Sequence, residues 1–226
     1  MYPLGEAVER AHTHPVARAP SVSTMAKPYD VHDRFYRKAK AQGLRARSAF
    51  KIDELAERMG VVKPGIAVLD LGAAPGGWLQ VLARRVGPSG LVVGVDLVPI
   101  KPLALPQVKL LQADVTSPGF AAQLAALTPT KLDLVTSDMA PKTCGIRATD
   151  EARSLELCGI ALRCAQDHLR PGGAFITKVF MGGDFKVFER QVRARFASIK
   201  IMRPEATRAH SFEVYLTARG FQPASA

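Results

Sequence analysis

The stretch that most constrains the fold is a short apolar run followed at once by a glycine-rich turn. Residues 66–71, Ile-Ala-Val-Leu-Asp-Leu, lie between a Pro-Gly pair and Gly72. Such a run is typical of a buried parallel strand. Residues 75–77, Pro-Gly-Gly, then stop the strand, and apolar residues with helical spacing resume at Trp78. Strand, turn and helix begin a βαβ unit, and open α/β sheets bind ligands at the carboxyl ends of such strands.

The glycines of this turn suit a ligand that approaches the backbone closely, and the next helix adds free N–H donors at its N-terminus. The spacing from Gly72 does not give the G-x-G-x-x-G dinucleotide fingerprint. Residues 70–77, Asp-Leu-Gly-Ala-Ala-Pro-Gly-Gly, look instead like the first motif of methyltransferases that bind S-adenosylmethionine. On this segment alone, an ordinary tight turn between strand and helix is the alternative.

The composition predicts a folded, soluble chain with a polyanionic partner. A length of 226 residues suits one domain with a full core, and no apolar run approaches a membrane span. The net charge of +11 favours nucleic acid over an anionic membrane as partner. The three cysteines form no C-x-x-C pair, so we expect neither disulfides nor a metal site, and a cytoplasmic location.

The N-terminal region divides into two parts. Residues 1–24 lack any period and any secretory signal, so we expect a disordered extension ahead of a single domain at 25–226. Residues 29–51 are densely basic, and a solvated helix face is the simplest interpretation. Their place ahead of a ligand-binding core favours a surface that contacts RNA phosphates. The cations are Arg34, Arg37, Lys38, Lys40, Arg45, Arg47 and Lys51.

Lys51 occupies an unusual position for a cation. Ser48 is expected to cap a helix that turns Ile52 and Leu55 toward the core. Lys51 then lies in the first turn, beside the positive end of the helix, where a cation is mildly unfavourable. This position hints at a role beyond stability.

The rest of the chain predicts alternating strands and helices. Strands are expected at 91–95, 108–112, 132–137 and 174–180, with an antiparallel pair at 199–202 and 212–218. Helices are expected at 119–127, from Thr149 or Asp150 to His168, and at 185–196. Cys158 and Cys164 are expected to be packing residues of the long helix.

Two acidic residues follow strands at positions that suit a nucleoside. Asp96 ends the second strand, 19 residues after Gly77, where an acid commonly accepts hydrogen bonds from ribose hydroxyls. Asp114 follows the third strand and could accept from the exocyclic amine of an adenine.

Four charged residues should meet at the same sheet edge as the glycine turn. Asp138 and Lys178 lie near the carboxyl ends of the fourth and fifth strands. An antiparallel last strand would bring Glu213 there, and Lys51 can reach from its helix. Lysine is rarely buried without a partner, so a purely structural ion pair is the alternative to a catalytic role.

Five motifs occur in order and carry a resemblance to a known family. They are Ser48-Ala-Phe-Lys51, Asp70-Leu-Gly-Ala-Ala-Pro-Gly-Gly-Trp78, Ser137-Asp-Met-Ala-Pro141, Lys178-Val-Phe180 and Ser211-Phe-Glu-Val-Tyr215. Over about residues 30–220 the chain resembles the FtsJ family of ribose 2′-O-methyltransferases. The resemblance implies a Rossmann-like class I methyltransferase fold: a seven-stranded, mostly parallel sheet with helices on both faces and an antiparallel last strand.

The resemblance also implies site residues. The catalytic tetrad becomes Lys51, Asp138, Lys178 and Glu213. The contacts to S-adenosylmethionine become Asp70, Gly72, Pro75, Gly76, Trp78, Asp96, Asp114 and Asp138. Lys178 is the implied base, which takes the proton of the 2′-hydroxyl only when neutral, while the two acids orient the lysines. The chain departs from the family at Lys142, where many relatives have Asn, which puts loop contacts near the substrate in doubt.

The implied substrate is the A-loop uridine of 23S-type ribosomal RNA in an assembled large subunit, methylated by a monomer. A tRNA ribose methyltransferase is one alternative. Another is an RNA-binding ribosome assembly factor whose methylation is incidental. A DNA or protein methyltransferase is disfavoured, because no Asp-Pro-Pro-Tyr type motif follows the fourth strand.

Overall fold

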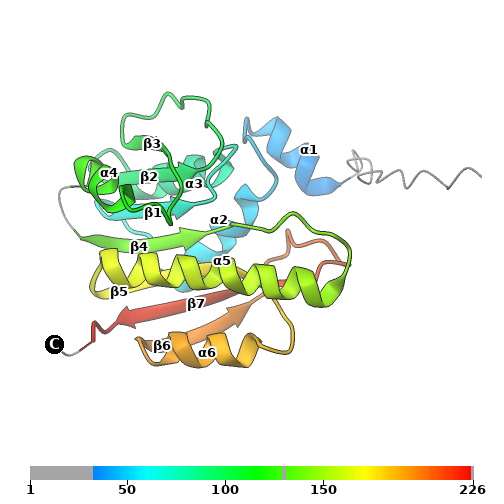
Figure 1. Ribbon diagram of the computed structural model, residues 1–226. Coiled ribbons are helices and arrows are strands. Elements are labelled where there is room, and N and C mark those ends of the chain that lie inside the picture. Colours follow the sequence, from blue (N-terminus) through cyan, green and yellow to red (C-terminus); the bar gives the residue numbers. More distant parts are fainter. Residues whose placement is uncertain (1–32, 129–130, 225–226) are drawn as a thin grey trace, which may run out of the picture. The chain divides into compact units, whose positions relative to one another are not determined.

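The computed structural model describes residues 33–128 and 131–224, so the predicted disordered extension at 1–24 lies outside the described residues. The elements, in chain order (Figure 1), are α1 Arg34–Ala41, α2 Ala49–Met59, β1 Ala67–Leu71, α3 Gly77–Val86, β2 Leu91–Asp96, β3 Val108–Gln112, α4 Phe120–Leu127, β4 Leu132–Ser137, α5 Arg147–His168, β5 Leu169–Phe180, α6 Phe185–Arg193, β6 Phe196–Met202 and β7 Glu213–Phe221.

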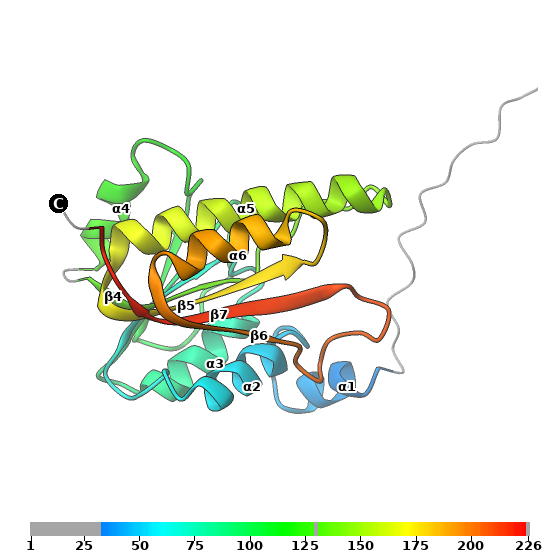
Figure 2. The ribbon, with the colours of Figure 1, turned by 90° about the horizontal axis from the view of Figure 1, so that it is seen from below.

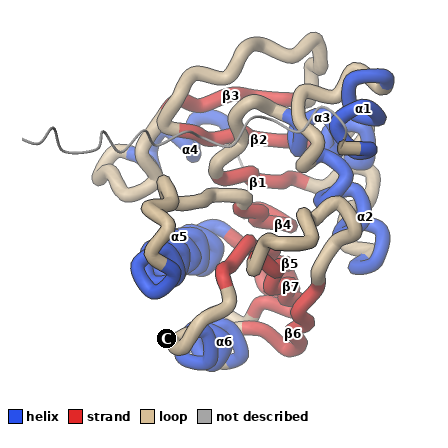
Figure 3. The backbone as a smooth tube through the Cα atoms, turned by 90° about the vertical axis from the view of Figure 1, so that its right-hand side faces the viewer, coloured by secondary structure: helices blue, strands red, loops and turns tan. Residues whose placement is uncertain are grey.

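The strands form one seven-stranded sheet in the order β3-β2-β1-β4-β5-β7-β6 (Figure 3). Six strands run parallel, and β7 runs antiparallel to both of its neighbours. The predicted fold class is confirmed. The strand order reverses direction between β1 and β4. The carboxyl ends of β1, β2 and β4 are aligned, because Leu71 of β1 pairs with Val95 of β2 and with Ser137 of β4. Such a switch point is where open α/β sheets bind ligands.

Helices cover both faces of the sheet, with α5 and α6 on one face and α1, α2 and α3 on the other (Figure 2). Each face has its own core. Leu69 and Leu71 of β1 pack in the core beneath α5 and α6, whereas Val68 packs in the core with α2 and α3. Because side chains alternate along a strand, a strand buried on both faces is expected to be apolar at most positions. This explains the apolar run at β1, which only the buried Asp70 interrupts.

The prediction that β5 begins at Ala174 is wrong, because the strand begins at Leu169. The pairing runs from Leu132 with Leu169 directly to Leu134 with Ala174, so residues 170–173 form an irregularity inside the ladder. Arg170 Nε donates to Asp133 Oδ1 at 2.6 Å across this irregularity. The Pro-Gly-Gly segment therefore ends the helix without ending the strand pairing.

Two predicted helix caps are also wrong. The α5 helix begins at Arg147, before the predicted cap at Thr149 or Asp150. The Asp150 carboxylate instead accepts hydrogen bonds from the backbone N–H groups of Cys144 and Gly145, at 2.8 and 3.1 Å. Ser48 occupies the N-cap position of α2 but makes no side-chain capping bond.

The α6 helix ends at Arg193, short of the predicted 196, because Phe196 begins the edge strand β6.

The predicted packing role of two cysteines can be compared with the structure. Cys158 and Cys164 are buried in α5, which confirms them as packing residues. None of the helices in the described part of the chain is long and apolar enough to span a bilayer.

Candidate active site

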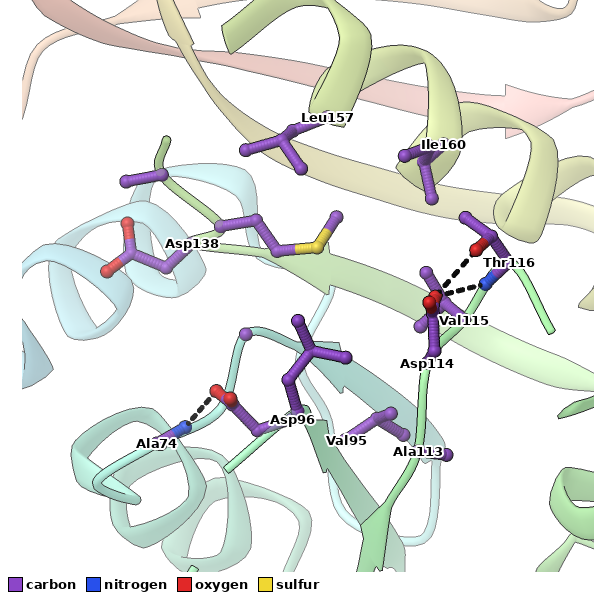
Figure 4. Close-up of a pocket in the computed structure, with 14 residues that line it drawn as sticks. Ala74, Val95, Asp96, Ala113, Asp114, Val115, Thr116, Asp138, Leu157 and Ile160 are labelled. Atoms are coloured by element: carbon purple, nitrogen blue, oxygen red, sulfur yellow. Dashed lines mark hydrogen bonds between the residues drawn. The ribbon is translucent and has the colours of Figure 1, made fainter. Parts of the chain in front are cut away.

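A cavity of about 350 Å³ opens at the switch point between β1 and β4 (Figure 4). Gly72 and Ala74 line it from the turn after β1. Asp96, Asp114 and Asp138 line it from the carboxyl ends of β2, β3 and β4. Apolar side chains, including two from α5, form much of the remaining wall: Val95, Leu97, Ala113, Val115, Met139, Leu157 and Ile160. The cavity thus combines three carboxylates with an apolar wall.

Gly72 is required for the shape of this cavity. Its φ of +73° lies in the left-handed region that favours glycine. A Cβ at this position would lie 2.8 Å from Met139 Cγ and 3.0 Å from Met139 N. Only glycine lets the turn after β1 lie this close to the loop that carries Asp138.

Two of the carboxylates are oriented by backbone N–H groups (Figure 4). Asp96 accepts from Ala74 N at 2.9 Å and from Val98 N at 3.0 Å, one bond on each oxygen. Asp114 Oδ1 accepts from both the N–H and the hydroxyl of Thr116, and these bonds lower the pKa of Asp114. Each Asp96 oxygen keeps a second lone pair for a ligand, and on Asp114 the Oδ2 oxygen makes neither of these bonds and can accept from a ligand hydroxyl or amine.

The other four predicted cofactor residues do not line the cavity, and three of them support the turn from behind. Pro75 O accepts from Arg45 Nη1 at 3.1 Å, and a Cβ at Gly76 would meet the same guanidinium at 3.0 Å. Trp78 is buried and donates from Nε1 to Ser48 O at 2.9 Å. These residues fix the turn and the start of α3 rather than face the cavity.

The fourth, Asp70, lies inside the sheet. Its side chain is buried, and its Oδ1 accepts from the Thr136 hydroxyl at 2.7 Å. Burial, with a smaller contribution from the charges of Asp138 and Asp96, raises the pKa of Asp70 to about 8. Asp70 is therefore a buried acid beneath the cavity.

The four residues of the predicted tetrad form two lysine–carboxylate pairs at the same sheet edge. Lys178 Nζ lies 3.1 Å from Asp138 Oδ1 and donates to the Asp138 carbonyl at 2.6 Å, and the lysine side chain is only 7% exposed. Lys51 Nζ donates to Glu213 Oε1. Glu213 reaches this edge because β7 is antiparallel, with Phe180 opposite Glu213.

Tyr215 joins the two pairs, and no role was predicted for it from the sequence. Its hydroxyl donates to Asp138 Oδ1 at 2.7 Å, and Lys51 Nζ lies 5.8 Å from the centroid of its ring. Burial, together with the charges of Asp138 and Glu213, holds the pKa of Tyr215 well above its usual value. It therefore remains a phenol donor. Strand alternation could have predicted its place at the site, since Tyr215 follows Glu213 by two residues and so points to the same face of β7.

Three cations of the basic segment are half-buried by contacts within the fold, whereas two cations of α1 make exposed contacts, Arg34 with Glu205 at 3.5 Å and Lys38 over the Phe50 ring. Arg45 donates to three backbone carbonyl groups, Arg47 pairs with Asp33, and Lys51 binds Glu213. The cations of α1 are exposed: Arg34, Arg37, Lys38 and Lys40. In the residues that the structure describes, no group of three or more His, Cys, Asp or Glu side chains could hold a metal ion.

Together, the strand order, the cavity at the switch point and the antiparallel β7 define the Rossmann-like fold of class I methyltransferases. The FtsJ-like methyltransferase family matches residues 44–221. The chain therefore belongs to the FtsJ-like methyltransferase family.

Curated relatives are similar over most of the chain. Ribosomal RNA large subunit methyltransferase E of Anaeromyxobacter sp. (strain Fw109-5) is 55% identical over 202 residues, which cover 89% of this chain and 73% of the relative. The protein of the same name from Myxococcus xanthus (strain DK1622) is 57% identical over 192 residues, covering 85% and 90%.

Solved structures share the fold. A putative ribosomal RNA methyltransferase from Plasmodium falciparum superposes with a TM-score of 0.71 at 24% identity and covers 78% of this chain and 98% of its own. Aeropyrum pernix fibrillarin, solved with natively bound S-adenosyl-L-methionine, gives 0.51 at 17% identity, with coverage of 70% and 68%. At these identities the likeness supports the fold alone.

Proposed function

We propose that this chain methylates a ribose 2′-hydroxyl in large-subunit ribosomal RNA, with S-adenosylmethionine as the methyl donor. The observation that carries the proposal is Lys178, a nearly buried lysine held by Asp138 at the edge of the cavity. Membership of the family supports the reaction class. The curated relatives, named as large-subunit ribosomal RNA methyltransferases, support the substrate.

The cavity suits the proposed donor. Its apolar wall can pack against an adenine, and Gly72 permits close approach of a ligand to the backbone. In this proposal Asp96 holds the ribose hydroxyls, Asp114 accepts from the adenine amine, and Asp138 faces the donor on one side and Lys178 on the other. Asp70, Pro75, Gly76 and Trp78 would act indirectly, by supporting the turn. When bound, S-adenosylmethionine supplies an electrophilic methyl group on a sulfonium.

The chain's own residues would move the proton and position the acceptor. A ribose hydroxyl is a weak acid, so a base must take its proton as the new O–C bond forms. Neutral Lys178 takes that proton on Nζ and then, as an ammonium, donates to Asp138. The Lys51–Glu213 pair lies beside it and orients the ribose, while Tyr215 fixes Asp138. Holding the reactants in line supplies much of the acceleration.

The narrower proposal is that the target is the A-loop uridine in the assembled large subunit, modified in the cytoplasm by a monomer during ribosome maturation. Resemblance to the bacterial branch of the family supports this target, and the exposed cations of α1 support an RNA contact beside the site. The rival substrate is tRNA. The rival of another class is an RNA-binding assembly factor.

Transfer of radiolabelled methyl to large subunits, free ribosomal RNA and tRNA tests the substrate. The expected result is label in large subunits that maps to one 2′-O-methyl uridine in the A-loop. Label in tRNA alone would support the rival enzyme. Label at another large-subunit ribose would retain the activity and reject the uridine.

Lys178→Ala tests the mechanism. We expect it to abolish methyl transfer, because the variant lacks the proposed base, while calorimetry shows donor binding nearly unchanged. Lys200→Ala removes an exposed lysine of β6 and is the matched control. Turnover retained by Lys178→Ala would remove the assigned base. Rescue of ribosome assembly by this inactive variant would favour the assembly factor.

A further inference from the structure

Arg147, the first residue of α5, lies at the sheet edge that carries the two lysine–carboxylate pairs. Its guanidinium carbon is 5.5 Å from the centroid of the Phe212 ring. Phe212 directly precedes Glu213 in the chain and packs edge-on against Phe180, with ring centroids 4.7 Å apart. The guanidinium is thus stacked on the residue next to a proposed catalytic group.

Arg147 is oriented by two contacts and is still open to solvent. Its Nε donates to Glu151 Oε1 at 2.7 Å. The Arg147 side chain is 71% exposed, whereas that of Glu151 is 14% exposed. Within residues 33–128 and 131–224, its two terminal nitrogens have no hydrogen-bond acceptor. The two terminal nitrogens of this guanidinium are therefore available to a ligand.

Helix stability does not explain this placement. Arg147 lies in the first turn of α5, where the helix dipole disfavours a cation. An arginine four residues before a glutamate is the weaker order of such a pair, and exposed pairs contribute little. The contacts of Arg147 therefore orient a cation beside the active site rather than stabilise the helix.

The position of Arg147 complements that of the α1 cations. The α1 helix and the first turn of α5 lie on opposite faces of the sheet near the same edge (Figures 2 and 3). Lys178 lies near the carboxyl end of β5, in the sheet that separates these two faces. A strand that presents one ribose to Lys178 carries a phosphate on each side of that ribose, so cations are needed on both sides.

We propose that Arg147 binds the phosphodiester next to the methylated ribose and so positions the RNA without touching the reacting atoms. An arginine fork matches two phosphate oxygens in a way that a lysine cannot. Phe212 and Glu151 hold the fork in advance, which reduces the entropy lost on binding. This inference rests on the proposed function.

The test compares Arg147→Ala, Arg147→Lys and the wild type on large ribosomal subunits that lack the modification. Methylation kinetics are measured over a series of KCl concentrations. Arg147→Ala should raise KM about tenfold with little change in kcat, since a charged hydrogen bond is lost. Arg147→Ala should also lower the slope of log KM against log salt concentration by about 0.7 to 0.9, because the loss of one phosphate contact changes the slope by about this amount. Arg147→Lys should keep the slope and recover only part of the affinity.

Arg163→Ala is the matched control, because it removes an exposed arginine from the same helix. It lies 16 residues further along, about 24 Å at 1.5 Å per residue, and should leave KM unchanged. Equal KM and slope for the Arg147 and Arg163 variants would overturn the inference. A raised KM with an unchanged slope would overturn the phosphate assignment in favour of base stacking.

Filter binding of the same subunits by each variant separates this inference from the proposed function. If the wild type binds but transfers no methyl, the proposed function fails, and the binding affinities still decide the role of Arg147. Calorimetry of S-adenosylmethionine binding confirms that each variant is folded.

Discussion

Tyr215 is the residue that connects the two lysine–carboxylate pairs, through its hydroxyl to Asp138 and its ring to Lys51. The pattern Ser-Phe-Glu-Val-Tyr placed it in a strand, two residues after Glu213. Its partner Asp138 is 77 residues away. The contact exists because β5 lies between β4 and β7, an order that no local pattern contains. The charged tetrad was easier to predict, because each member ends or begins an element at one edge.

Tyr215→Phe removes only the hydroxyl and keeps the ring against Trp78 and Lys51. Asp138 then loses the donor that fixes its carboxylate beside Lys178. We expect kcat to fall about tenfold and the free energy of unfolding to fall by about 1 kcal/mol, the usual value of one hydrogen bond. Donor affinity, measured by calorimetry, should stay within a few-fold. An unchanged kcat would show that Asp138 keeps its position without the phenol.

Asp70 should make stability depend on pH. With its pKa raised from 3.8 to about 8, the folded chain holds a proton that the unfolded chain loses above about pH 4. The stabilising contribution of this proton is complete below that pH and is lost as the pH rises toward 8. Asp70→Asn carries no such proton. Urea unfolding of both proteins should show wild-type stability falling relative to Asp70→Asn between pH 5 and pH 8, and parallel curves would contradict a buried neutral acid.

At the scale of elements, sequence predicted the buried strands and missed the ends that depend on distant contacts. The bounds of β3 and β4 match the prediction, because each is an apolar run between breaking residues. The start of β5 depends on the bond between Arg170 and Asp133, and the start of α5 on how Asp150 binds its preceding loop. Neither partner can be chosen from local propensity.

The turn after β1 offers a test at this scale. Gly72 and Gly60 both have positive φ, +73° and +62°, but a Cβ at Gly60 would meet nothing within 4 Å. Gly60→Ala should cost about 1 kcal/mol of stability through backbone strain alone. Gly72→Ala should cost about 1–3 kcal/mol, because Met139 must also move. It should weaken donor binding at least tenfold by displacing the loop that carries Asp138.

Thermal unfolding and calorimetry measure these two effects separately. Equal donor affinity in the Gly72 and Gly60 variants would show that the close approach of the two loops does not shape the cavity.

At the scale of the whole molecule, charge was visible in the sequence but its distribution was not. The net charge of +11 predicted a polyanionic partner without distinguishing internal from exposed cations. Arg45 and Arg47 are used to hold loops, whereas the α1 cations are exposed. The part of the basic segment that is available to RNA is thus narrower than its sequence suggested, and it lies on the face that carries α2.

A double substitution tests whether this exposed surface contacts RNA. Arg37→Ala with Lys40→Ala removes two exposed cations of α1. Neither residue lines the cavity or belongs to a lysine–carboxylate pair. We expect a lower affinity for large subunits. The plot of log affinity against log salt concentration should also become less steep, by up to about two, because about one fewer counterion is released on binding for each phosphate contact that is lost. Arg163→Ala with Arg190→Ala removes the same charge from α5 and α6 on the opposite face and serves as the control. The affinity for S-adenosylmethionine should be equal in the two double variants. If the two double variants lose the same affinity and slope, RNA binding reflects net charge alone, and α1 is an ordinary solvated helix.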